Sequence, residues 1–376
     1  MNWKIPLFEI YWDTKDIKAV EKIIRRGTYW SSGPEIEEFE HEIANYIGSS
    51  YSVAFNSGTS ALHAALLAHG ITQDEVIVPS FTFVATANAV VLAGAKPIFA
   101  EIEQESFGLD IEDVKEKINN KTKAIIPVHY GGGVCKDIKA LKDIASDKKL
   151  ILIEDAAESL GAKIDNKMVG SFGDSAMFSF CQNKIITAGE GGLVVTNSKD
   201  MYDKLHLICS HGRVETKEGF FESTSDLDYV QMGYNYRMST ISAALALSQF
   251  QKIDKIVKLR QEKAFYYNEK LSNIDFLRIP HTSDNLDHVY QLYTVLFENK
   301  ELRDKAQNAL TEKSIMSKVY FEPIHLKTFY KKMYSYKQGD LPKTEQISEK
   351  VLTLPLYPLL TTSQLDLIIS TIKNIR

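Results

Sequence analysis

Cysteine is scarce in this sequence, with Cys135, Cys181 and Cys209 the only three among 376 residues. They are odd in number and far apart, so neither a disulfide framework nor a metal-binding spacing is indicated. The sequence has no run of about 18 apolar residues that could span a bilayer, and its N-terminus has no basic segment followed by an apolar one. We therefore expect no metal site, no membrane segment and a location in the cytoplasm.

Concentrated positive charge is also missing. The formal net charge is −5, and no block of lysine and arginine appears, so nucleic acid is not expected as a partner. With 44% hydrophobic and 25% charged residues, the composition is that of a soluble globular protein. The chain is too long for one simple core. We predict a large domain over residues 1–245, followed by a linking helix and a small domain over residues 246–376.

Apolar runs typical of strands alternate with helical patterns between about residues 50 and 160. The strand-like runs are residues 52–55, 76–79, 96–101, 122–129 and 151–155. This alternation predicts βα units and a mostly parallel sheet. Further on, we predict one long helix over 241–271, strands over 289–297, 317–321 and 351–354, and a helix over 362–375. Two polar stretches, 214–228 and 327–337, are predicted to be loops.

Four residues with functional side chains, Ser57, Phe83, His129 and Asp155, each stand at or just after the end of a strand-like run. Ligands of such sheets collect at the carboxyl ends of the strands, so these residues are expected near one site. The turn at Ser57 leads into an apolar helix and could hold a phosphate on its N–H groups and hydroxyls, or simply cap the helix. Phe83 could lie against a planar cofactor or belong to the core.

Lys184 is flanked by apolar residues and followed by a turn rich in glycine. Partial burial would favour the neutral amine that forms a Schiff base with an aldehyde cofactor. Asp155 ends an apolar strand upstream, and an acid beside a pyridine nitrogen keeps that nitrogen protonated and the ring electron-poor. Taken singly, a lysine is usually a solvated surface charge, and an acid after a strand is often a helix cap.

Four segments occur in the order in which they stand in the DegT/DnrJ/EryC/StrS sugar aminotransferases. They are Ser57–Leu62, Glu154–Ser159, Phe178–Gly192 and Gly233–Arg237. The chain resembles this family from Gly27 to Pro358. The resemblance implies the α/β fold-type I aminotransferase architecture, in which helices sandwich a mostly parallel seven-stranded sheet and a smaller α+β domain follows. It also implies pyridoxal 5′-phosphate as cofactor and a homodimer with active sites at the interface.

The resemblance also implies roles for single residues. Lys184 matches the lysine that holds the cofactor as a Schiff base, and Asp155 matches the acid at the ring nitrogen. Glu158 stands where many relatives have a glutamine that contacts the phenolic oxygen of the ring. The remaining matches are Gly58, Thr59, Ser60 and Ser179 in the phosphate cradle, Asn235 reaching that phosphate from the neighbouring subunit, Phe83 stacking on the cofactor, and Trp30, Arg237 and His325 near the substrate.

Two departures from the common pattern point to a branch of the family. The residues before the lysine, Cys181–Asn183, and the stretch His288–Tyr293 look more like the GDP-perosamine synthase branch, which moves an amino group from glutamate to C4 of GDP-4-keto-6-deoxymannose. In 3-dehydrase relatives a histidine replaces the lysine, so Lys184 favours amino transfer. Three alternatives stay open: amination of a 3-keto or other nucleotide sugar, amination of a cyclitol with glutamine as donor, and a non-catalytic regulatory role.

Overall fold

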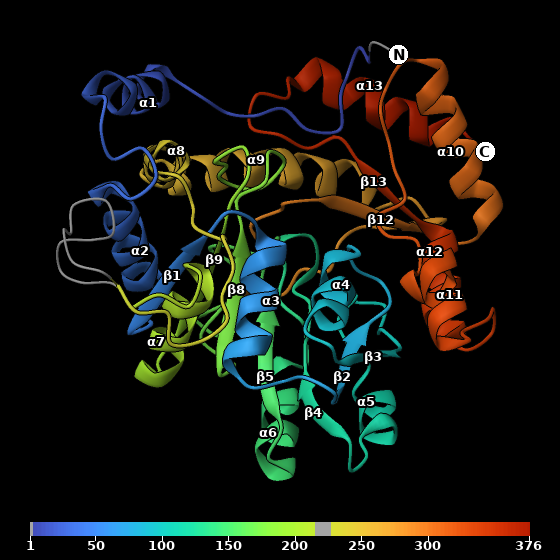
Figure 1. Ribbon diagram of the computed structural model, residues 1–376. Coiled ribbons are helices and arrows are strands. Elements are labelled where there is room, and N and C mark those ends of the chain that lie inside the picture. Colours follow the sequence, from blue (N-terminus) through green and yellow to red (C-terminus); the bar gives the residue numbers. More distant parts are fainter. Residues whose placement is uncertain (1–2, 215–226) are drawn as a thin grey trace.

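The computed structural model describes residues 3–214 and 227–376. Its centre is a seven-stranded sheet with the order β1-β9-β8-β5-β4-β2-β3 (Figure 1). β9 is antiparallel to both neighbours, and all other adjacent pairs are parallel. The strands are β1 (Tyr51–Phe55), β2 (Glu75–Pro79), β3 (Lys96–Ala100), β4 (Thr122–Ile125), β5 (Ile151–Asp155), β8 (Ser175–Ser179) and β9 (Gly192–Thr196). The predicted mostly parallel sheet is confirmed.

Helices cover both faces of this sheet because its strands are apolar on both faces. In β5, Leu152 and Ile153 point to opposite faces and belong to two separate hydrophobic clusters. The cluster around Leu152 includes side chains of α2, α6 and α8, and the cluster around Ile153 includes side chains of α3, α4 and α7. These helices are α2 (Pro34–Ile47), α3 (Gly58–Ala68), α4 (Ala85–Leu92), α6 (Ile138–Lys148), α7 (Lys199–Cys209) and α8 (Thr240–Phe250).

The long helix predicted over 241–271 is wrong in one respect, because the structure has two helices there. α8 ends at Phe250 and α9 spans Ile253–Leu271. At the break, the Lys252 ammonium lies 2.5 Å from the carboxylate of Asp16, and both side chains are buried. Asp16 belongs to α1 (Thr14–Arg26), so a buried ion pair with a remote helix accompanies the turn between α8 and α9.

A second, antiparallel sheet with the order β10-β12-β13 lies in the C-terminal part, against α9, α10 and α13 (Figure 1). The predicted strand over 289–297 is shorter, and residues 317–321 contribute only a single bridge, Lys318 to Thr353. Ile5, which lies in the predicted large domain, packs into the hydrophobic cluster of this C-terminal part. The domain division at residue 245 stays a prediction. The elements are β10 (Leu277–Arg278), β12 (Tyr293–Phe297), β13 (Val351–Leu354), α10 (Lys300–Glu312), α12 (Pro342–Lys350) and α13 (Thr362–Lys373).

A loop was predicted over 327–337, but the structure has helix α11 (Thr328–Tyr334) there. The helix forms because one face is not solvated: Tyr330 is buried, and its hydroxyl donates to Asn88 Oδ1 of α4 at 2.6 Å. The other predicted loop, 214–228, lies almost wholly outside the described residues. The remaining elements are α5 (Ile111–Lys117), the 3₁₀ turns η1 (Tyr130–Gly132) and η2 (Ile324–Leu326), and a small sheet of β6 (Lys163–Ile164), β7 (Lys167–Met168) and β11 (Leu286–Asp287).

Candidate active site

Asp155 is the last residue of β5, at the carboxyl end of the central sheet, and it is only 4% exposed. Its Oδ2 accepts a hydrogen bond from the Thr86 hydroxyl at 2.7 Å, and its Oδ1 accepts the Ala157 N–H at 3.2 Å. Burial raises the pKa of Asp155, whereas these two hydrogen bonds and the nearby Lys184 charge lower it. Because little water surrounds a carboxylate buried in this way, its charge is weakly screened and acts strongly on a neighbouring group.

Lys184 lies in the loop between β8 and β9, and its side chain is mostly buried, with 13% exposed. The amine lies 3.5 Å from Oε1 of Glu158. Oε2 of Glu158 accepts the Gly131 N–H at 2.9 Å, which fixes the carboxylate. The charge of Lys184 lowers the pKa of Asp155 and the charge of Glu158 raises it, so these three predicted residues lie near one another.

The predicted phosphate cradle lies at the start of α3. Ser57 is the N-cap, and its hydroxyl accepts the Ser60 N–H at 3.1 Å. The N–H groups of the first turn, Gly58 and Thr59 among them, have no partner within a helix and favour an anion. A Cβ on Gly58 would lie 3.0 Å from Cβ of Ser179, so glycine is what lets Ser179 sit against the helix end. Backbone N–H groups and a serine beside a helix N-terminus fit a phosphate.

Phe83, just after β2, is 59% exposed, so the alternative that it belongs to the core is wrong. The core residue of this segment is Phe81, which is fully buried. Phe321 is the aromatic neighbour of Phe83, with ring centroids 6.3 Å apart. An exposed ring of this size is available to stack on a planar group.

Three further predicted residues lie at the surface or partly exposed. Asn235 has an exposed side chain. Its backbone runs beside the end of β1, where the Asn56 N–H donates to the Tyr236 carbonyl at 2.7 Å. Arg237 donates to the Ser210 hydroxyl at 3.0 Å. Trp30 is 48% exposed, and its ring N–H donates to a carbonyl of α1.

Two histidines have no free ring nitrogen. His325, predicted to lie near the substrate, is fully buried, and its ring bonds Ser80 at 2.7 Å through Nδ1 and Glu345 at 3.0 Å through Nε2. In this conformation it joins η2 to the segment after β2 and offers nothing to a sugar. His129, also buried, accepts the Cys135 N–H at 3.0 Å through Nδ1 and lies 2.9 Å from Glu154 through Nε2.

Sequence reasoning missed Thr86, which donates directly to Asp155, and Thr82, whose hydroxyl lies 2.9 Å from that of Thr86. The only sequence signal was two threonines four residues apart after a strand. Polar residues such as threonine are common at the start of any helix. The sequence alone therefore did not indicate that Thr86 bonds Asp155.

The sequence matches the DegT/DnrJ/EryC1/StrS aminotransferase family over residues 11–373. The chain belongs to this family. It is 38% identical over 373 residues to GDP-perosamine synthase of Vibrio cholerae, covering 98% of each chain. Two solved structures share the fold at full length. Helicobacter pylori PseC, an aminotransferase involved in the biosynthesis of pseudoaminic acid, has a TM-score of 0.91 and 26% identity, covering 99% of this chain and 98% of that one.

The second structure is the putative sugar aminotransferase Spr1654 of Streptococcus pneumoniae in its PMP-form, with a TM-score of 0.92 and 25% identity, covering 100% of this chain and 98% of that one. This family member is a sugar aminotransferase that depends on pyridoxal phosphate. The exposed Phe83 ring, the buried acid Asp155 and the cradle at Gly58 fit that cofactor in shape and charge.

Within residues 3–214 and 227–376, no helix is both long and apolar enough to cross a membrane. Within the same part of the chain, no group of three or more His, Cys, Asp and Glu side chains is placed to hold a metal ion.

Proposed function

We propose that this aminotransferase moves the amino group of glutamate to C4 of a nucleotide-linked 4-keto-6-deoxy sugar. The observation that carries the chemistry is the placement of the Lys184 amine 3.5 Å from Glu158 and within electrostatic reach of the buried Asp155. The full-length similarity to GDP-perosamine synthase supports the choice of sugar, with GDP as the nucleotide.

The described residues would hold the cofactor as follows. The Lys184 amine would bond its aldehyde carbon, Asp155 would pair with its ring nitrogen, and Glu158 would contact its phenolic oxygen. Gly58, Thr59, Ser60 and Ser179 would hold its phosphate at the start of α3, and Phe83 would stack on its ring. Bound pyridoxal phosphate supplies an electron-poor ring that accepts the electron pair released when a C–H bond next to nitrogen breaks.

Lys184 has a second task, which is to move protons. Its freed amine would serve as the base that takes the proton from the carbon carrying the amino group of glutamate and as the acid that returns it on the side of the cofactor. The same steps in reverse aminate the keto-sugar. Glu158 stabilises the ammonium that Lys184 becomes in between, because its carboxylate is fixed beside the amine by the Gly131 N–H.

Trp30, which is 48% exposed, and Arg237, which is partly buried, are the proposed contacts to the nucleotide sugar. His325 is not among them in this conformation, because both of its ring nitrogens are already bonded. We also infer a homodimer in which Asn235 reaches the phosphate of the partner's cofactor. The exposed side chain of Asn235 supports this, because it has room to project toward a second copy.

The test uses the purified protein with pyridoxal phosphate. We expect a visible absorbance band that shifts when glutamate is added and returns when GDP-4-keto-6-deoxymannose follows, and we expect Lys184→Ala to lack both changes. A wild-type protein that holds the cofactor but shows no shift with glutamate would refute the amino transfer from glutamate. If the band returns only with UDP- or dTDP-linked sugars, with a 3-keto sugar or with a cyclitol, the amino transfer stands and the proposed substrate is wrong.

A further inference from the structure

The carboxylate of Asp155 has few hydrogen-bond donors for a buried charge. Among the described residues, its side chain accepts from the Thr86 hydroxyl at 2.7 Å and from the Ala157 N–H at 3.2 Å. A buried carboxylate keeps its charge only where such donors and nearby cations replace water. The Thr86 hydroxyl makes the shorter of the two bonds, and it comes from a side chain that can be changed without touching the backbone.

The direction of the hydrogen bonds follows from their chemistry. An ionised carboxylate only accepts, so the Thr86 hydroxyl donates its proton to Asp155. The Thr82 hydroxyl, 2.9 Å from that of Thr86, must then donate to it. Both threonines are at most 3% exposed, so water does not compete for these bonds. A chain of hydroxyls that all donate toward one carboxylate is polarised along its length, which strengthens the last bond.

Thr82 and Thr86 lie in the same short segment as the exposed ring of Phe83. The Thr86 N–H donates to the Phe83 carbonyl at 3.2 Å, which fixes the turn between the threonines. At the other end of the segment, the Ser80 hydroxyl is bonded to His325 at 2.7 Å. The segment after β2 is thus held at both ends, and the two hydroxyls have a defined position relative to Asp155.

We propose that Thr86 is a positioning residue for amino transfer, and that its hydroxyl, oriented by Thr82, holds the Asp155 carboxylate turned toward the ring nitrogen of the cofactor. The inference rests on the proposed role of Asp155. Two other charged groups act on this carboxylate: the Lys184 ammonium, which favours its ionised form, and Glu158, which opposes it. Neither of them is removed by a change at residue 86, so the effect of the hydroxyl can be measured separately.

The test compares Thr86→Val, which keeps the shape and loses the hydroxyl, with Thr86→Ser, which keeps the hydroxyl. Each protein is loaded with pyridoxal phosphate labelled with ¹⁵N in the ring, and the nitrogen resonance is followed from about pH 6 to 9. In Thr86→Val we expect the ring nitrogen to lose its proton at a pH about one unit lower, and in Thr86→Ser near the wild-type pH. We expect kcat for glutamate to fall roughly 10-fold or more in Thr86→Val, with KM nearly unchanged.

A Thr86→Val protein with the wild-type nitrogen titration and kcat would overturn the inference. Thr82→Val provides a second measurement in case Thr86→Val does not fold: it should shift the titration in the same direction by less, and a wild-type titration in this variant would also overturn the inference. Failure of the wild-type protein to respond to glutamate is a different result, because it refutes the proposed function itself, whereas a normal wild type beside an unaffected Thr86→Val refutes only the role of Thr86.

Discussion

Lys184 and Glu158 form a mostly buried ion pair, with Nζ and Oε1 3.5 Å apart and the side chains 13% and 7% exposed. Asp155, three residues before Glu158, makes no direct bond to the lysine and is held by Thr86 instead. The two acids therefore have different surroundings within one site. Glu158 is placed to act on the Lys184 amine. Asp155 is not bonded to that amine and is left for its proposed partner, the ring nitrogen of the cofactor.

Replacing Glu158 separates its charge from its role as an acceptor. Glu158→Gln keeps an oxygen for the Gly131 N–H, so we expect normal stability, with the glutamate half-reaction slowed about 10-fold because the Lys184 ammonium loses its anionic partner. Glu158→Leu also leaves the Gly131 N–H without an acceptor in a buried place, so unfolding free energy should fall by about 1–3 kcal/mol. Urea unfolding and stopped-flow absorbance measure the two effects. Equal stability of the two variants would contradict the assigned role of Oε2.

Glu40 on α2 makes stability depend on pH. Burial raises its pKa from 4.5 to about 8, against the lowering effect of the Ala54 N–H bond. The unfolded chain loses this proton from about pH 4.5 upward and the folded protein only near pH 8. The contribution of Glu40 to stability is thus full below about pH 4.5 and is lost as the pH rises to about 8.

Glu40→Gln should abolish this dependence, because the amide never ionises and still offers an oxygen to the Ala54 N–H. We expect thermal unfolding equal to wild type at about pH 4, and a gain of about 1–3 kcal/mol at about pH 8.5, less than the full pKa difference because the side chain is partly exposed. Glu42→Gln, at an exposed position of the same helix, is the matched control and should show no gain. Identical curves for wild type and Glu40→Gln at both pH values would show that Glu40 is not the cause.

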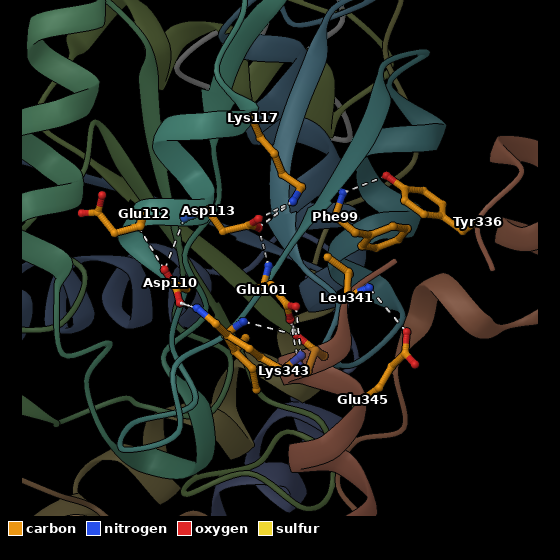
Figure 2. A network of polar contacts seen from close by, with 12 residues as sticks. Phe99, Glu101, Asp110, Glu112, Asp113, Lys117, Tyr336, Leu341, Lys343 and Glu345 are labelled. Atoms are coloured by element: carbon orange, nitrogen blue, oxygen red, sulfur yellow. Dashed lines mark hydrogen bonds and ion pairs between the residues drawn. The ribbon is translucent and has the colours of Figure 1, made fainter. Parts of the chain in front are cut away.

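Glu101, directly after β3, holds the start of α12 (Figure 2). Its carboxylate accepts the N–H groups of Lys343 and Thr344 at 3.0 and 2.7 Å and the Thr344 hydroxyl at 2.6 Å. Glu101→Ala leaves these donors at a helix N-terminus without their acceptor, so we expect a loss of about 2–4 kcal/mol in unfolding free energy. Glu112→Ala removes a mostly exposed acid of the same region and should cost less than about 0.5 kcal/mol. Losses of similar size in the two variants would refute the cap.

Patterns along the sequence predicted the sheet, the order of its strands along the chain and the residues around Lys184, because these depend on local periodicity and on short motifs. The features that were missed depend on contacts between remote segments. The break before α9 involves Asp16 and Lys252, and the burial of His325 involves Ser80, 245 residues away. Thr86 belongs to the same class, since only the fold shows that its hydroxyl lies beside Asp155.

Asn235 gives a test of whether two chains share each site. If its amide bonds the partner's cofactor phosphate, Asn235→Ala should bind pyridoxal phosphate about 10-fold more weakly, the scale of one hydrogen bond to a charged group. Lys184→Ala should be inactive by itself. In a hybrid dimer of the two variants, one site would combine an intact Lys184 from one chain with an intact Asn235 from the other. We therefore expect the hybrid, purified through two different tags, to recover about half of the wild-type activity at low cofactor concentration. If Asn235 acts within its own chain, no site in the hybrid is intact, and its activity would not exceed half that of the Asn235→Ala dimer.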